Sequence, residues 1–414
     1  MKLALIDIKQ LITVASHGRR VKIGPEMSDI GVIENAAVLV EDQTIRWVGK
    51  MEDLSMSSLK ETEVLDCLDK TVMLGFVDGH THLMFAGSRE GEFALRSAGV
   101  GYQEIAERGG GILSTVEAVR AASKKELKKN ARRYLGAALR HGTTTVEIKS
   151  GYGLDKEHEI KMLEALNELN KEEVLTVVPT FLGAHAVPPE FKGRDEDFVQ
   201  EIITGMIPYI GSKRLARFCD VFCEKGYFDP VQCEAILLQA KQFNLKPKLH
   251  AEELSSLGGA ELAARVGAVS ADHLEHVTDA GIQALASAGV VAMLLPGVSF
   301  FLGHPYAPAR KLINAGVPVA LATDFNPGSC MSYSMPLMMT MGCTQMHMSP
   351  EETIAAATIN AAAALDLSSE IGSIEVGKKA DLIVLDVPDY AYVPYHFGEN
   401  HVDRVVKDGV VLEV

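Results

Sequence analysis

An apolar run that ends in two histidines constrains this chain more than any other stretch. Residues 72–82 read VMLGFVDGHTH, a segment that is typical of a buried strand. Side chains alternate along a strand, so His80 and His82 leave it on the same side and can meet at one metal ion. Histidines that merely end a strand are the competing interpretation, and further ligands must decide between the two.

Seven further apolar runs follow, and helical segments fit between them. Eight strands that alternate with helices are the number that closes a (β/α)8 barrel. Ser123 and Glu126 predict a capping box for a helix that ends before Gly142. Residues 155–170 and 350–365 predict two more helices. The seven expected strands cover residues 143–148, 175–182, 218–223, 247–249, 268–271, 290–295 and 317–323.

Both ends of the chain have a β-strand pattern that the middle lacks. Strands too few to be stable alone at either end are best explained as one small domain assembled from both. We therefore expect an α/β fold, with a TIM-like barrel over residues 71–369 and a small β-sandwich-like domain built from residues 1–70 and 370–414. The terminal runs cover residues 4–14, 36–49, 64–72, 380–386 and 402–414.

Composition excludes several classes of protein. The chain has 40 Lys and Arg against 55 Asp and Glu, a formal charge of −15, and no long basic cluster, which argues against nucleic acid as a partner. Asp7 and Lys9 interrupt the apolar opening before it reaches the length of a signal peptide. No later run approaches the roughly 20 apolar residues of a membrane span. We expect a cytoplasmic protein with no membrane partner.

The cysteines predict neither a zinc-thiolate site nor disulfides. They are scattered without CxxC pairs, and Cys219 and Cys223 fall in a strand-like run where a thiol acts as a small apolar side chain. This usage fits a reducing compartment.

Polar side chains follow several of the expected strands at their carboxyl ends, where barrel enzymes place their catalytic groups. His185 follows the third strand, His250 the fifth, Asp272 and His273 the sixth, and Asp324 the eighth. Three imidazoles and one carboxylate suit Zn²⁺ or Fe²⁺, so we predict His250 and Asp324 as further ligands. Asp324 can also accept a proton. His273 is expected beside the metal as a catalytic or supporting imidazole.

These motifs resemble the amidohydrolase superfamily and, within it, the imidazolonepropionase family, which opens the ring of 4-imidazolone-5-propanoate in histidine degradation. Leu74 stands where a proline commonly precedes the glycine, a departure inside the strand that affects no chemistry. The broader likeness rests on DGHTH at 78–82, His250, DH at 272–273, Asp324 and GKKADL at 377–382. The narrower one rests on GGGILST at 109–115, KSGYGL at 149–154, GAHAVPPE at 183–190, SADHL at 270–274, DFNPGS at 324–329 and PYHFG at 394–398.

The resemblance implies hydrolysis of a cyclic amide to N-formimidoyl-L-glutamate in a homodimer. It implies one divalent or trivalent metal ion, zinc or iron, and water attack on the ring carbonyl. Asp324 would transfer the proton to the ring nitrogen, while Glu253 or His273 would activate water or orient the ring. The implied metal ligands are His80, His82, His250 and Asp324. The implied substrate contacts are Arg89, Tyr152, His185, Glu253, Asn326, Gly328 and Ser329.

Physical chemistry supports these contacts. Arg89 can hold a propanoate tail bidentately, although a solvated arginine is an equal expectation from the residues alone. Asn326, the Gly328 amide and Ser329 form a turn of donors beside Asp324.

Two other functions remain open. An aminohydrolase that releases ammonia from a nucleobase or a related heterocycle would share the metal site and differ around Arg89, Tyr152 and the turn at Asn326. A non-catalytic protein that keeps the barrel is disfavoured, because no expected ligand is missing.

Two local features have competing interpretations. The glycines at 109–111 lack the Lys-Ser/Thr ending of a phosphate-binding loop, so we expect a flexible cover over the barrel mouth. Glu224 or Lys149 could support a second metal, although the family resemblance implies a single ion.

Overall fold

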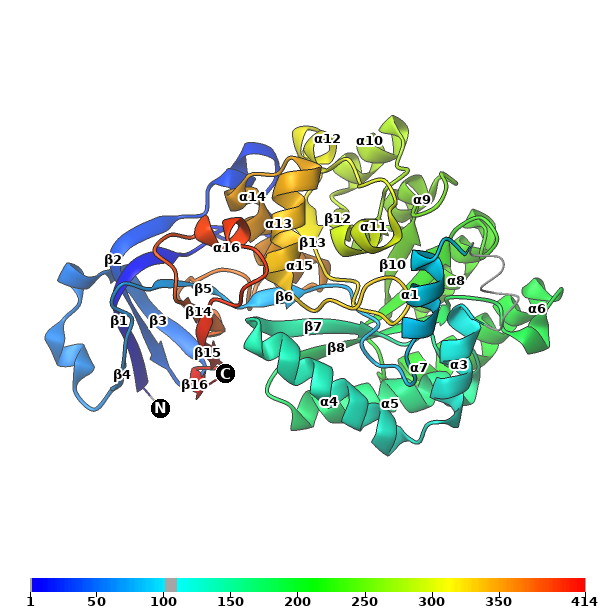
Figure 1. The fold of residues 1–414 in the computed structure, drawn as a ribbon, viewed down its shortest axis with the longest axis horizontal. Helices are drawn as coiled ribbons and strands as arrows, with labels where there is room; N and C mark the ends of the chain where they lie inside the picture. The colour runs from blue at the N-terminus through cyan, green and yellow to red at the C-terminus, as the bar shows by residue number, and fades with distance from the viewer. Residues whose placement is uncertain (1, 101–109, 414) are drawn as a thin grey trace.

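A parallel barrel and a second sheet beside it make up the fold (Figure 1). The computed structural model describes residues 2–100 and 110–413. The eight barrel strands are hydrogen-bonded in chain order, and a bridge between Thr81 and Phe325 joins the first to the last. The predicted fold class is confirmed. The strands are β6 (Phe76–Asp78), β7 (Thr143–Lys149), β8 (Thr176–Ala184), β9 (Phe218–Cys223), β10 (Lys246–Ala251), β11 (Ser270–His273), β12 (Val291–Leu294) and β13 (Val319–Leu321).

Helices between these strands cover the outside of the barrel (Figure 1). The predicted capping box is confirmed, since Ser123 and Glu126 bond to each other's backbone amides. These helices are α1 (Glu90–Ser97), α3 (Ile112–Ala121), α4 (Lys124–Arg140), α5 (Lys156–Glu172), α6 (Asp195–Gln200), α7 (Ile207–Lys213), α8 (Pro230–Gln242), α9 (Gly259–Val266), α10 (Asp279–Ala288), α11 (Pro296–Leu302) and α12 (Ala309–Asn314). The last barrel strand is followed by α13 (Met335–Met346), α14 (Pro350–Ala357), α15 (Ile359–Ala364) and, further along the chain, α16 (Tyr392–Tyr395).

The segment predicted as one helix over residues 350–365 is two helices. The break falls at Thr358, whose backbone has φ −128° and ψ −94°. Its hydroxyl donates to the carbonyl of Ile354 at 2.7 Å, a local bond that competes with regular helix geometry. Two distant carbonyls, of Lys22 and Val319, accept from the amide of Asn360 at 2.9 and 2.8 Å and fix the second helix in place.

Strands from both ends of the chain form the second sheet (left in Figure 1). It is one mixed sheet in the order β16-β15-β14-β5-β1-β2-β3, with β4 also paired to β1. It includes residues up to Leu74, and the predicted domain boundary at residue 70 stays a prediction. The strands are β1 (Lys2–Ile12), β2 (Val32–Glu41), β3 (Thr44–Lys50), β4 (Glu63–Asp66), β5 (Thr71–Leu74), β14 (Leu382–Leu385), β15 (Val402–Lys407) and β16 (Val410–Glu413).

The run predicted as one strand over residues 72–82 is divided between the two sheets at Gly75. The Gly75 amide donates to Asp381 of the terminal sheet at 3.0 Å, and the next amide, of Phe76, donates to Gly142 of the barrel at 2.8 Å. A Cβ at Gly75 would lie 2.2 Å from Thr144, so only glycine lets the chain pass here. This switch places the two histidines beyond the end of β6.

Two other findings concern the whole described chain. Every cysteine is a free thiol, and all but Cys343 are buried. No helix in residues 2–100 and 110–413 is both long and apolar enough to cross a bilayer.

Candidate active site

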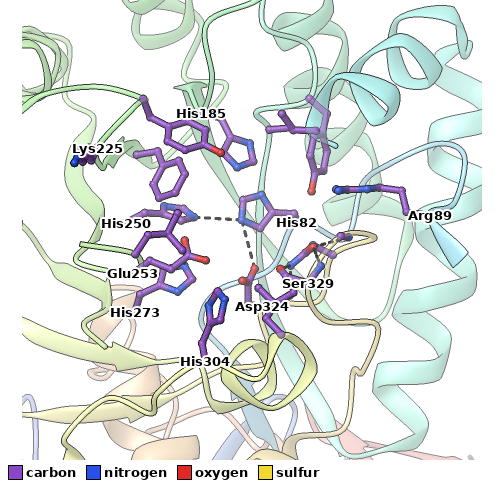
Figure 2. A pocket seen from close by; sticks show the side chains of 18 of the residues that line it. His82, Arg89, His185, Lys225, His250, Glu253, His273, His304, Asp324 and Ser329 are labelled. Carbon is purple, nitrogen blue, oxygen red and sulfur yellow. Dashed lines mark hydrogen bonds and ion pairs between the residues drawn. The ribbon is translucent and has the colours of Figure 1, made fainter. Parts of the chain in front are cut away.

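Four predicted ligand side chains converge at the carboxyl end of the barrel strands (Figure 2, where three are labelled). His82 Nε2 lies 3.3 Å from His250 Nε2 and 3.5 Å from Asp324 Oδ1. The Asp324 oxygen also lies 3.6 Å from His80 Nε2. Ligands about 2.1 Å from a tetrahedral ion are roughly 3.4 Å from one another. The ligand atoms of His80, His82 and Asp324 lie within 4.8 Å of one another, as expected for one shared cation, and His250 adjoins them through His82.

The hydrogen bonding of the cluster also fits a cation. His80 Nε2 and Asp324 Oδ1 are buried and have no hydrogen-bond partner among the described residues. Unpaired buried polar atoms are unfavourable, and a metal ion would satisfy both. A divalent cation is thus the ligand that this donor set suits, while zinc and iron are equally compatible with it.

Two buried carboxylates hold the outer nitrogens of the ligand histidines. Asp272 Oδ2 lies 2.6 Å from His80 Nδ1, and Asp220 Oδ2 lies 3.1 Å from His250 Nδ1. Such contacts orient each ring so that Nε2 is left for a metal. Sequence analysis missed Asp220. Its available signal was a carboxylate inside the otherwise apolar strand β9.

Protonation of the cluster follows from burial. Burial, with the neighbouring charges of Lys149 and other imidazoles, holds the pKa of His80 and of His82 well below the usual range, so both rings are neutral as metal binding requires. Burial also opposes protonation of His250, but Asp220 outweighs it and raises the pKa. Burial raises the pKa of Asp324 to about 8, and a bound cation would reverse that effect.

The geometry gives no support to a second metal at Lys149 or Glu224. The Lys149 ammonium lies 2.7 Å from Asp220 and 3.0 Å from Glu147. Burial opposes its charge, but these carboxylates outweigh burial and raise its pKa, so the lysine stays protonated. Glu224 accepts the amides of Leu254 and Ser255 at 2.9 and 3.2 Å. Glu224 therefore stabilises the loop that carries Glu253 through these hydrogen bonds.

A cavity of about 600 Å³ opens beside the ligand cluster (Figure 2). The structure brings all of the predicted substrate contacts and His273 to its wall. Sequence analysis missed other lining residues, because no local pattern marks them. The missed residues are Arg96, Ile112, Phe222, Lys225, Tyr227, Leu254, Leu302 and His304. Gly109 of the expected glycine-rich cover lies outside the described residues.

Arg89 and the turn at Asn326 form one side of the cavity. The Arg89 guanidinium binds Glu92 with two hydrogen bonds, of 3.0 and 2.8 Å. The predicted turn is present, but the Gly328 and Ser329 amides both donate to Asn326 Oδ1 at 2.8 Å. These amides are thus used within the turn rather than left free for a ligand.

Glu253 and His273 lie on the opposite side (Figure 2). Their Oε2 and Nε2 atoms are 3.6 Å apart. Burial raises the pKa of Glu253 to about 7, although His250 opposes the shift, so this carboxyl can exchange a proton near neutral pH. His273 has a backbone φ of 78°, in the left-handed region that non-glycine residues uncommonly adopt.

His185 is stacked on His82, with ring centroids 4.9 Å apart. Its Nδ1 lies 2.9 Å from the carbonyl of Gly151, so Nδ1 carries the proton and Nε2 is left as an acceptor. Burial lowers the pKa of His185 to about 3, which keeps the ring neutral. Tyr152 packs against it with a centroid separation of 5.5 Å.

Glu159, which sequence analysis also missed, supports the loop that carries Tyr152. Its carboxylate is buried and accepts the amides of Gly151, Gly153 and Leu154 at 2.8 to 3.1 Å. We expect Glu159→Ala to lower the free energy of unfolding by about 2 to 4 kcal/mol, because buried amides lose their acceptor. Urea denaturation measures the change. Exposed Glu157 on the same helix is the matched control, and equal stability of the two alanine variants would contradict the assignment.

The fold and family comparisons agree with this geometry. A model described as the amidohydrolase family matches residues 234–412. The structure of Escherichia coli guanine deaminase superposes with a TM-score of 0.77 at 16% identity, covering 100% of both chains, which shows a shared fold. The barrel, the converging histidines and aspartate, and the family match define the class as the amidohydrolases.

Relatives that match over nearly the whole chain identify one family within the amidohydrolases. An imidazolonepropionase from Geobacillus sp. (strain WCH70) is 51% identical over 409 residues, which are 98% of this chain and 96% of the relative. Another, from Alkaliphilus oremlandii (strain OhILAs), is 49% identical over 408 residues, again 98% of this chain and 96% of the relative. The chain belongs to the imidazolonepropionase family.

Proposed function

We propose that this protein hydrolyses 4-imidazolone-5-propanoate to N-formimidoyl-L-glutamate in histidine degradation. Water adds to the ring carbonyl carbon, the adjacent carbon-nitrogen bond breaks, and the ring nitrogen takes up a proton. The observation that carries the proposal is the placement of a metal-ligand cluster on the wall of a cavity that also presents Arg89 and Glu253. The identity of the proposed substrate comes from membership of the imidazolonepropionase family.

The proposed metal ligands are His80, His82, His250 and Asp324, around one zinc or iron ion. When bound, such an ion polarises a carbonyl and lowers the pKa of a water from 15.7 to about 7. A rival cluster of His80, Glu147 and Asp272 is also close enough for one ion. Glu147 is already paired with buried lysines there, and Asp272 with His80 Nδ1, so we assign the ion to the cavity side.

The side chains of the chain itself handle the proton and the substrate. Asp324 and Glu253 face the cavity and are the groups that can take a proton from water and return it to the leaving nitrogen. His273, neutral because burial lowers its pKa, orients Glu253. The neutral ring of His185 and the hydroxyl of Tyr152 suit the polar edge of the heterocycle.

Arg89 is proposed to hold the propanoate tail. Its side chain is only 13% exposed, so a carboxylate bound to it is largely removed from water. We expect Arg89→Ala to weaken substrate capture by about 2 to 5 kcal/mol, mainly through a higher KM. Steady-state kinetics measures this loss. Arg46→Ala, an exposed substitution in β3, is the control, and an unchanged KM in the Arg89 variant would refute the role.

The direct test is incubation with 4-imidazolone-5-propanoate, following the loss of its ultraviolet absorbance and the appearance of N-formimidoyl-L-glutamate. Ring opening that stops on chelation and returns with zinc or iron supports the proposal. Release of ammonia from guanine or cytosine without ring opening would instead indicate an aminohydrolase.

We extend the proposal to the setting of the enzyme. A reducing, cytoplasmic location fits the free cysteines, and a homodimer is the assembly expected from the family resemblance. We also propose two domains, a barrel and a smaller domain built from both termini, with residues 71–369 and residues 1–70 plus 370–414 as their expected bounds.

A further inference from the structure

A second guanidinium lines the cavity close to Arg89. Arg96, which follows Arg89 by two turns of α1, donates from Nη2 to the carbonyl of Gly328 at 3.0 Å. On the same residue, a Cβ added to Gly328 would lie 2.2 Å from Nη1 of Arg89. Both guanidiniums therefore meet at Gly328, where a side chain would displace the end of Arg89.

The guanidiniums of Arg89 and Arg96 differ in their contacts with carboxylates. Glu92 neutralises Arg89 through a two-bond contact and also accepts the Gly111 amide at 3.0 Å. No carboxylate in the described part of the chain lies within 4 Å of the Arg96 guanidinium. Burial, together with repulsion from Arg89, lowers the pKa of Arg96. The Arg96 guanidinium lies instead over the ring of Phe301, 5.0 Å from its centroid. Among the described residues, the three side chains of Arg89, Glu92 and Arg96 thus carry one net positive charge, which a ligand carboxylate would balance.

We propose that Arg96 and Arg89 form a two-guanidinium subsite for the carboxylate tail of the substrate, in which Arg96 determines the preference for an anionic tail. This inference rests on the proposed function for the identity of the substrate. Glu92 holds Arg89 in position from the far side. Arg96 contributes the positive charge that the Arg89 and Glu92 pair lacks, while Arg89 contributes hydrogen-bond donors.

Equilibrium binding tests the subsite without turnover. Imidazole-4-propanoate and its neutral amide, imidazole-4-propanamide, are titrated calorimetrically into the metal-loaded wild type and into R96M, R96K and R265M. We expect R96M to weaken binding of the propanoate roughly 10- to 100-fold and of the amide less than about threefold. R96K, which keeps the charge, should recover part of the loss. R265M, which removes an exposed arginine paired with Glu234, should bind both as the wild type does.

Kinetics separates this inference from the proposed function. With 4-imidazolone-5-propanoate, R96M should raise KM while kcat changes less than about threefold, as expected for lost uniform binding. Equal weakening of acid and amide would show that Arg96 merely supports the turn at Gly328, and it would overturn the subsite, as would unchanged affinity for the acid. A wild type that binds the acid but opens no ring would contradict the proposed function alone.

Discussion

Asp324→Ala is expected to remove both the bound metal and turnover. The aspartate supplies the only carboxylate oxygen of the proposed ligand set, and that oxygen faces His80 and His82 at 3.6 and 3.5 Å. Without it, only three imidazoles remain as ligands, and one of the two proposed proton acceptors is lost. We expect kcat to fall by roughly four orders of magnitude or more, since metal and proton transfer fail together.

Metal content and turnover are measured on the same preparation. Mass spectrometry of the purified variant gives ions per chain, and ring opening gives kcat. Asp53→Ala, at an exposed position near the terminal sheet, is the matched control and should retain both. An Asp324 variant that keeps one tightly bound ion and wild-type kcat would show that this residue is neither a required ligand nor a required proton acceptor.

Glu253→Gln is expected to lower kcat by about 10²- to 10⁴-fold while leaving the metal in place. Glutamine preserves the shape of the side chain and removes only its ability to accept a proton. The pKa of Glu253 is about 7, raised by burial, and a base must be deprotonated to act. In the wild type, kcat should therefore fall as the pH drops below about 7, by roughly tenfold per unit.

The variant separates catalysis from binding. Glu253→Gln should lose the acidic limb of the pH profile and keep its affinity for imidazole-4-propanoate. Glu117→Gln, at an exposed position on α3, provides the control. A normal kcat in the Glu253 variant would contradict its role as the base and would indicate that Asp324 is the base.

Regular local patterns made much of the fold predictable. Buried parallel strands appear as short apolar runs, and their ends were marked by histidines such as His185 and His250. The capping box at Ser123 and Glu126 could be predicted because its two partners lie three residues apart in the sequence.

Features that depend on how side chains are placed in three dimensions were not predictable from the sequence. The break at Gly75 depends on Thr144 across the sheet, and the roles of Asp220 and Glu159 depend on the atoms that surround them. The internal use of the Gly328 amide follows from the rotamer of Asn326. Arg96 was not predicted as a site residue, because nothing in the sequence around it places its guanidinium beside that of Arg89.

Crystallography of the protein grown with zinc or iron, with anomalous scattering recorded at the absorption edge of the metal, tests the central claim most directly. One ion should lie about 2.0 to 2.2 Å from Nε2 of His80, His82 and His250 and from an oxygen of Asp324. An ion bound instead between Glu147 and Asp272, or a full-strength peak away from all four side chains, would contradict the account.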